Sequence, residues 1–246
     1  MKKMAWITGI LTGMMIIFAA LGSVLNAVCQ IAVDETFYHE QSRAAVKKAM
    51  GYTTEEEVSA YIGLTQEQQK EFAWIASRYM LGEDQSIDFP LYVSEDEVRH
   101  MIDVRGLIFT ARDMSKVYLT LAAALAVVIA WTGARLKNRM RPQLIGALAA
   151  VTVMMVLVQN IVNQISAGGF ETLFVQMHET LFTNDLWMMN PETDILIRIM
   201  PQPLFEQALV NGANMALRML LVMAVMLFAI DLLVGGMIRR HLNKEK

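Results

Sequence analysis

Four long apolar stretches alternate with charged segments along the chain and predict its main elements. Three of them contain no Asp, Glu, Lys or Arg, and in the fourth Asp231 is the one charge between residues 219 and 238. A helix that crosses a bilayer needs about 20 predominantly apolar residues. The pattern therefore predicts four transmembrane helices, at residues 4–33, 117–134, 142–167 and 213–238.

Basic residues between and beyond these stretches predict the orientation of the chain. Two lysines precede the first stretch, a basic turn occupies residues 135–141, and a basic tail follows at residues 239–246. Short segments rich in Lys and Arg stay on the cytoplasmic side of a membrane. We therefore expect both termini in the cytoplasm. Two segments are then extracellular: a long, acid-rich one at residues 34–116, and a shorter one at residues 168–212 that lies at the membrane surface.

The composition agrees with an all-α membrane protein. Of the 246 residues, 55% are hydrophobic, and the mean hydropathy is +0.38. Cys29 is the single cysteine, so no internal disulfide can form, and no basic tract indicates binding of nucleic acid. The first stretch also fits a signal peptide, but it is long and ends without a clear cleavage site. We therefore expect a retained helix.

The long extracellular segment is predicted to be mostly helical. Three Ser or Thr residues each precede a Glu or Gln by three positions, which is the pattern of a capping box at the start of a helix. The three pairs are Thr54 with Glu57, Thr65 with Gln68, and Ser94 with Glu97. Gly51, Gly63 and Gly82 separate the predicted helices.

His100, in the helix predicted to start after Ser94, is the first candidate catalytic residue, because histidine exchanges protons near neutral pH. Asp103 follows three positions later, so both side chains are expected on one helix face, where the carboxylate fixes the tautomer of the imidazole. The alternative is a surface helix with ordinary ion pairs. The 16 residues from His100 to Lys116 span about 24 Å of helix. A role on lipid therefore requires a bend, for which we expect Gly106 to be the hinge.

His178, in the shorter extracellular segment, is the second candidate. Residues 170–182 carry an apolar stripe at helical spacing and predict a short amphipathic helix, with His178 at the border of the stripe. The alternative is an interfacial segment that only packs against the transmembrane helices.

The residues after this helix predict an interfacial anchor and a further helix. Trp187 stands where tryptophan often anchors a chain at headgroup depth. Asn190 and Pro191 have the residue types of a helix start, which places Asp194 in the first turn. Pro201 and Pro203 are predicted to end this helix.

The two histidine runs resemble the lipoprotein intramolecular transacylase family of low-GC Gram-positive bacteria. The matching residues are Glu97, His100, Met101, Asp103 and Val104, then His178, Trp187, Pro191, Thr193, Asp194, Leu196, Ile197 and Pro201. Phe37 and Tyr38, which follow the first apolar stretch, also fit. The layout of four spans, with the larger extracellular segment between the first two, extends the resemblance over nearly the whole chain.

The resemblance implies an acyltransferase of the cell membrane that acts on a diacylated bacterial lipoprotein among membrane phospholipids. The enzyme would move the sn-2 acyl chain from glycerol to the α-amine of the N-terminal cysteine, at the outer leaflet and without a cofactor, to give the lyso form. The resemblance assigns catalysis to His100 and His178. We favour His178 as general base and His100, oriented by Asp103, as its partner. Further candidates that orient a histidine or stabilise an oxyanion are Arg105, Trp187 and Asp194.

Other chemistries and functions have less support in the sequence. There is no Gly-x-Ser-x-Gly motif for a serine nucleophile, and two lone histidines with scattered acids do not form a pattern of metal ligands. The alternative function is a non-enzymatic membrane protein whose long extracellular segment binds an envelope partner. A transporter is disfavoured, because Asp231 is the one charge deep in the predicted spans.

Overall fold

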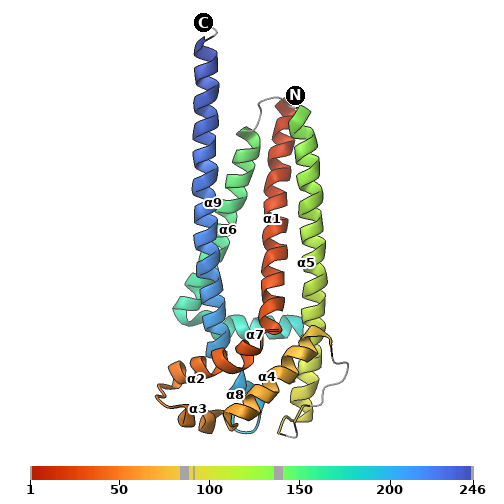
Figure 1. Ribbon diagram of the computed structural model, residues 1–246, viewed down its shortest axis with the longest axis vertical. Helices are drawn as coiled ribbons and strands as arrows, with labels where there is room; N and C mark the ends of the chain where they lie inside the picture. The colour runs from red at the N-terminus through yellow and green to blue at the C-terminus, as the bar shows by residue number, and fades with distance from the viewer. Residues whose placement is uncertain (1, 84–88, 91, 136–140, 245–246) are drawn as a thin grey trace. The chain divides into compact units, whose positions relative to one another are not determined.

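The computed structural model describes residues 2–83, 89–90, 92–135 and 141–244, and every regular element in them is helical (Figure 1). In chain order these are α1 Lys2–Ala32, η1 Phe37–Gln41, α2 Ser42–Met50, α3 Glu55–Ile62, α4 Gln66–Leu81, α5 Glu95–Arg135, α6 Arg141–Gln164, η2 Ile165–Gly169, α7 Phe170–Leu181, α8 Ile195–Ile199 and α9 Gln202–Lys244. The all-α prediction is confirmed. Most of the predicted basic turn, the last two residues of the tail and the side chain of Asp231 lie outside the described residues.

Four helical stretches in the described part of the chain are long and apolar enough to cross a membrane. They are Lys3–Ala32, Glu95–Thr132, Pro142–Leu181 and Gln202–Met226. The prediction of four transmembrane helices is confirmed. Since a crossing needs only about 20 residues, the longer stretches continue beyond the bilayer.

The chain folds into two compact units. The first, here the membrane unit, comprises residues 1–24, 114–163 and 212–246, and the second, here the histidine unit, comprises residues 25–113 and 164–211. The histidine unit covers most of both segments that were predicted to be extracellular, and it contains both candidate histidines.

Small residues bring helices of the membrane unit into backbone contact. A Cβ atom on Gly146 of α6 would overlap the backbone of Gly9 in α1, and one on Gly9 would overlap the carbonyl oxygen of Pro142. Ser115 of α5 donates a hydrogen bond to the carbonyl oxygen of Gly22 at 2.8 Å. Close backbone approach through glycine is a common mode of helix association in membranes, where lipid removes the hydrophobic drive for packing.

The outward side chains of the membrane unit are apolar. Ile10, Val127 and Met219 are 64%, 69% and 62% exposed, and many other large apolar side chains of this unit are exposed to a similar extent. Such exposure would be a liability in water, whereas in a bilayer these side chains contact lipid. The pattern agrees with a multi-pass membrane protein.

The histidine unit, in contrast, has a hydrophobic core of its own. The ring of Phe72 in α4 stacks on Phe89 at 5.0 Å and meets Tyr38 of η1 edge-on at 6.2 Å. Ile62, Met80 and other fully buried side chains complete this core. Because these residues come from several short helices, the core joins them into one body.

Two predicted helix starts in the long extracellular segment are confirmed. Thr54 and Thr65 both form complete capping boxes, with Glu57 and Gln68 respectively. The helices α2, α3 and α4 each end at a glycine with positive φ, Gly51, Gly63 and Gly82. Only glycine adopts this conformation without steric cost.

Two expectations about helix geometry are wrong. Gly106 is not a hinge, because α5 continues through it as an unbroken α-helix from Glu95 to Arg135. The buried side chains of Met101 and Ile108 hold the turns on both sides of Gly106 to the same core. The helix expected to start at Pro191, with Asn190 as its N-cap, starts four residues later, at Ile195.

Hydrogen bonds of the intervening turn explain this later start. The Asn190 side chain accepts from the Glu192 amide at 3.0 Å, and the Asn190 amide donates to Asp194 Oδ2 at 2.7 Å. Asn190 therefore closes a side-chain turn instead of capping a helix. Pro203 also differs from the prediction, because it lies in the first turn of α9, where its missing N–H costs nothing.

Candidate active site

The structure brings His100 of α5 and His178 of α7 together inside the histidine unit. Their ring centroids are 6.3 Å apart, the ring planes differ by 27°, and each residue is 8% exposed. The two residues are 78 positions apart in the sequence. This convergence is the geometric condition for joint proton transfer.

Aromatic rings surround the histidine pair. Phe174 and Phe182 lie 4.1 and 5.4 Å from the His178 ring, one helical turn before and after it, and Trp187 stacks on His178 at 4.9 Å. Phe182 also contacts His100, at 5.0 Å. The spacing 174, 178, 182 places side chains on one face of a helix, so the sequence pattern contained this arrangement. The rings shield the imidazoles from water.

A backbone hydrogen bond fixes the tautomer of His178. Nδ1 of its ring lies 2.7 Å from the carbonyl oxygen of Phe174. Since a carbonyl oxygen can only accept, Nδ1 carries the proton, and Nε2 of the neutral ring has a free lone pair. The hydrogen bond therefore leaves Nε2 as the atom of the His178 ring that can accept a proton.

Both imidazoles are neutral at pH 7. The pKa of His100 is lowered to about 4, chiefly by burial and also by the neighbouring His178, while Asp103 opposes both effects. Burial also lowers the pKa of His178, while the hydrogen bond to Phe174 raises it. Nδ1 of His100 is buried and has no hydrogen-bond partner among the described residues. An unpaired buried polar atom is unusual in a native protein and marks a place where function can explain the cost.

Glu97, one turn before His100, fixes the start of α5 against α8. Its carboxylate is buried, at 2% exposure, and accepts hydrogen bonds from the backbone N–H groups of Leu196 at 2.6 Å and Ser94 at 2.8 Å. The Glu97 N–H donates in return to Ser94 Oγ at 3.3 Å, so the predicted capping box is present. The sequence showed this local box but not the bond to Leu196, 99 positions away.

Asp103 does not hydrogen-bond to His100. Its Oδ2 accepts from Nδ2 of Asn184, 2.9 Å away, in the loop that follows α7. The carboxylate acts on His100 only through its charge. The sequence therefore placed Asp103 near His100 but missed Asn184, which no local motif distinguishes.

Of the other candidates, Trp187 contacts His178, whereas Arg105 and Asp194 contact residues other than the two histidines. The Arg105 guanidinium lies over the rings of Tyr79 and Phe109, at 4.1 and 5.0 Å. Asp194 accepts from the Asn190 amide and from the Thr193 hydroxyl, which stabilises the turn before α8.

A cavity of about 240 Å³ adjoins the histidine pair, with Phe182 as the shared wall. It is lined by Ile102, Asp103, Gly106, Leu107, Leu181, Phe182, Thr183 and Asn184. Ile102 and Leu181 are about half exposed, at 50% and 48%. The lining of this cavity therefore includes polar side chains, such as Asp103 and Asn184, and exposed apolar side chains.

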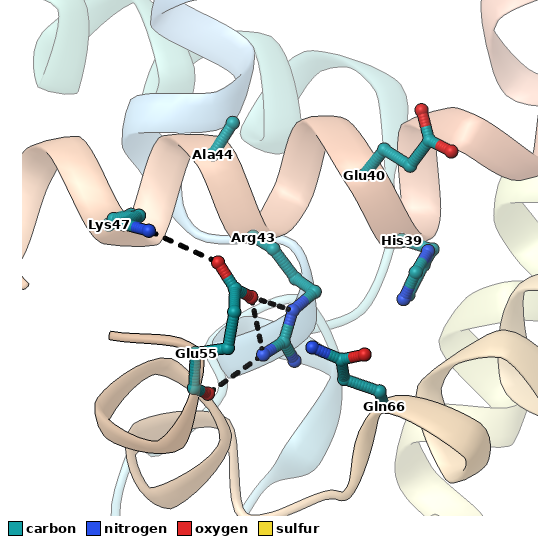
Figure 2. Close-up of a pocket in the computed structure, with 7 residues that line it drawn as sticks. All are labelled: His39, Glu40, Arg43, Ala44, Lys47, Glu55 and Gln66. Atoms are coloured by element: carbon teal, nitrogen blue, oxygen red, sulfur yellow. Dashed lines mark hydrogen bonds and ion pairs between the residues drawn. The ribbon is translucent and has the colours of Figure 1, made fainter. Parts of the chain in front are cut away.

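A second cavity, of about 280 Å³, lies elsewhere in the histidine unit (Figure 2). It is lined by His39, Glu40, Arg43, Ala44, Lys47, Glu55 and Gln66. Arg43 donates to Glu55, to Ser59 and to Gln69, and Lys47 donates to the same Glu55 carboxylate at 3.2 Å. The side chain of Arg43 thus links α2 to α3 and α4. No group of three or more metal-ligating side chains occurs in the described part of the chain.

Comparison with known proteins extends these observations. A model of the family "lipoprotein intramolecular transacylase Lit" matches residues 10–205. The fold is similar to that of the membrane-integral lipoprotein intramolecular transacylase Lit from Bacillus cereus, with a TM-score of 0.65 and 16% identity over 98% of this chain and 100% of that chain. Two variants of that protein, with histidine replaced by arginine or by alanine, match with TM-scores of 0.58 and 15% identity, over 98% and 97% of this chain and 96% and 97% of theirs. A search of curated protein sequences finds no match.

Proposed function

Because the chain belongs to the Lit family of lipoprotein intramolecular transacylases, we propose that His100 and His178 are its catalytic pair. The main observation in support is that the two rings lie close together, with centroids 6.3 Å apart, and contact the rings of Phe182 and Trp187. Histidine is the usual acid–base residue near neutral pH. The remaining two histidines of the chain, His39 and His241, lie outside this pair.

The reaction converts an ester into an amide within one substrate molecule. The α-amine of the N-terminal cysteine attacks the carbonyl carbon of the sn-2 ester, and a tetrahedral intermediate forms. The bond to the glycerol oxygen then breaks, and one proton passes from the nitrogen to that oxygen. No water is consumed and no redox partner is needed, because the amide is more stable than the ester.

His178 is suited to move this proton. Its Nδ1 is bound to Phe174, so the free lone pair of Nε2 can accept a proton from the attacking amine. The same Nε2 then returns the proton to the leaving glycerol oxygen. The lowered pKa of His178 keeps the base neutral at pH 7 and favours rapid return of the proton.

His100 is suited to stabilise the negative charge that develops on the carbonyl oxygen of the ester in the tetrahedral intermediate. A neutral imidazole donates one N–H, and a donor placed in a dry site stabilises an oxyanion more than it does in water. A backbone N–H is the other candidate for this role. Arg105 is a weaker candidate, because its guanidinium lies on the rings of Tyr79 and Phe109.

Proximity and exclusion of water supply the rest of the rate. Donor and acceptor belong to one molecule, so holding them in a reactive geometry avoids the entropy cost of a bimolecular step. Phe174, Phe182 and Trp187 keep water from the imidazoles. Hydrolysis of the ester is thereby suppressed.

For the membrane topology, we propose that both termini are cytoplasmic and that the site acts at the outer leaflet, in contact with phospholipid. The basic residues at positions 2–3, 135–141 and 239–246 support this orientation. The spans are then residues 4–33, 117–134, 142–167 and 213–238. Exposed apolar residues of the histidine unit such as Met177 and Met188, at 43% and 61%, support a position against lipid.

Mass spectrometry of lipoprotein N-termini tests the proposal. A Gram-positive host that makes only diacylglyceryl lipoproteins should produce N-acyl, S-monoacylglyceryl termini when it expresses this chain. The His100→Ala and His178→Ala variants should be present in the membrane at similar levels but give almost no lyso form. Full activity of both variants would refute the assignment of the pair, and unchanged diacylglyceryl termini with the wild-type chain would refute the reaction.

A further inference from the structure

The cavity beside the histidine pair has one charged group in its lining. The seven other lining residues are uncharged, and Asp103 supplies a carboxylate. An α-amine has a pKa of about 7.7–8.0 and is mostly a cation at pH 7. The single charge of the cavity is therefore opposite in sign to the charge on the substrate's N-terminus.

Asn184 orients this carboxylate. The side-chain oxygen of Asn184 accepts from the Leu186 N–H at 3.2 Å, which directs its Nδ2 toward Asp103 Oδ2 at 2.9 Å. In the described residues, Oδ1 of Asp103 has no hydrogen-bond partner. One carboxylate oxygen is thus held in place while the other can accept from a ligand.

The cavity has room for a small polar group but not for a whole lipid. No atom lies within 4 Å of the position that a Cβ on Gly106 would take, so a ligand can reach the backbone of α5 there. At about 240 Å³ the cavity is smaller than pockets that enclose a drug-sized ligand, roughly 300–1,000 Å³. It therefore fits the N-terminal cysteine, while acyl chains extend over exposed residues such as Ile102 and Leu181.

We propose that the cavity lined by Asp103 and Asn184 binds the α-ammonium group of the substrate lipoprotein, with Asp103 as its counter-ion. This inference rests on the proposed function. Phe182 lines the cavity and contacts both imidazoles. An amine held there is adjacent to the base that must remove its proton.

Binding by a carboxylate has a consequence for the pH dependence of turnover. A nearby negative charge favours the ammonium form and raises the pKa of the bound amine. The acid limb of kcat, which reports the bound substrate, is then set by the raised pKa. Among the other titratable groups nearby, His100 and His178 have lowered pKa values, and Glu179 and Asp185 are exposed.

The pH profiles of the Asp103→Asn variant, measured on the full-length enzyme with a synthetic diacylglyceryl lipopeptide, test this inference. Loss of the counter-ion should raise KM about tenfold. It should also move the acid limb of kcat to lower pH by about one unit, because the bound amine loses its proton more easily. Asp185→Asn removes the same charge from an exposed residue that does not line the cavity, and its profile should match the wild type.

Two further measurements separate this role from a structural one. Asp103→Glu should restore the wild-type limb, because it retains the charge. In the inactive His178→Ala background, a lipopeptide with a free amine should bind about tenfold more tightly than its N-acetyl analogue, and Asp103→Asn should abolish that preference. An acid limb that stays in place in Asp103→Asn, or equal binding of both lipopeptides in the His178→Ala background, overturns the inference. Absence of turnover by the wild-type enzyme would instead refute the proposed function.

Discussion

The membrane unit and the histidine unit hold their helices together by different means. In the membrane unit, Gly9 and Gly146 place the backbones of α1 and α6 in direct contact, and most large apolar side chains point outward. In the histidine unit, aromatic and aliphatic side chains form a buried core, and polar side chains cross it. The first mode suits lipid, which is as apolar as the side chains themselves, and the second suits water.

Two sets of hydrogen bonds connect α8 to other helices of the histidine unit. Gln69 accepts from Arg43 at 3.1 Å and donates to Ser42 at 3.1 Å, and Ser42 donates to the carbonyl oxygen of Ile199 in α8. Glu97 joins the first turn of α5 to the other end of α8. Since a buried hydrogen bond requires a defined geometry, these connections fix the short helices around the two histidines. The comparison teaches that buried polar bonds position helices in the histidine unit, whereas glycine contacts join helices in the membrane unit.

The largest loss of activity is expected from substitution of His100 or His178. Neither residue belongs to the two sets of hydrogen bonds described above. His178→Ala and His100→Ala should each lower kcat by about 10²–10⁴-fold, the usual contribution of a general acid–base group. The melting temperature in detergent should change little, because neither ring bonds to another helix in the described residues. His39→Ala, in the same unit but outside the pair, is the control and should retain activity. A large loss of activity in that control would show that activity in this unit is sensitive to any change of histidine.

The second largest effect is expected when the hydrogen bond between Glu97 of α5 and Leu196 of α8 is lost. Glu97→Ala leaves the buried N–H groups of Ser94 and Leu196 without an acceptor, which should cost about 2–4 kcal/mol of stability. Thermal unfolding in detergent, with turnover measured in parallel, would detect both the lower stability and the displaced histidine pair. Glu95→Ala is a matched control, since that side chain is 93% exposed. Equal stability of the two variants would contradict the importance of the buried carboxylate.

A substitution in the membrane unit should have a smaller effect on turnover. Gly146→Leu forces α1 and α6 apart and should destabilise the fold by about 1–3 kcal/mol. Turnover at a permissive temperature should fall less than in Glu97→Ala, because the core of the histidine unit is unchanged. Gly212→Leu is the control, as nothing lies within 4 Å of its Cβ position. A complete loss of turnover in folded Gly146→Leu would show that the spans, too, position the site.

Acidification should produce the smallest effect. Burial lowers the pKa of His100 from an unfolded value of about 6.5 to about 4. The unfolded state then binds more protons below pH 6.5, so stability falls as the pH drops from 6.5 toward 4. Between pH 7 and pH 5.5 this single group accounts for about 1 kcal/mol. Melting curves of the wild type and of His100→Gln should show a weaker pH dependence in the variant, and parallel curves would contradict the prediction.

Local signals in the sequence predicted much of the fold and half of the site. The spans follow from uninterrupted apolar runs, and the capping boxes at Thr54 and Thr65 follow from residues three positions apart. His100 and His178 stood out by residue type and setting. The distant partners of two residues near His100 were not predictable: Asn184 binds Asp103 across 81 positions, and Leu196 binds Glu97 across 99. Such bonds depend on tertiary structure and leave no periodic trace in the sequence.

The errors have the same origin. Gly106 is a weak helix former, yet the buried neighbours Met101 and Ile108 keep the helix straight through it. Asn190 and Pro191 have the residue types of a helix start, but the hydrogen bond between Asn190 and Asp194 favours a turn. In both cases local propensity yields to contacts that form only in the folded chain.

The group that holds the proposed base is a main-chain atom. The carbonyl oxygen of Phe174 binds His178 Nδ1 one helical turn away, so no side chain has to supply the third member of a triad. Alanine scanning does not remove this main-chain oxygen. Such a scan would therefore identify two essential histidines but no residue that orients them. By the same logic, substitution at position 174 should preserve this hydrogen bond as long as the helix persists, although it removes the ring that shields His178. The tautomer of His178 therefore depends on the backbone of α7 and not on a side chain.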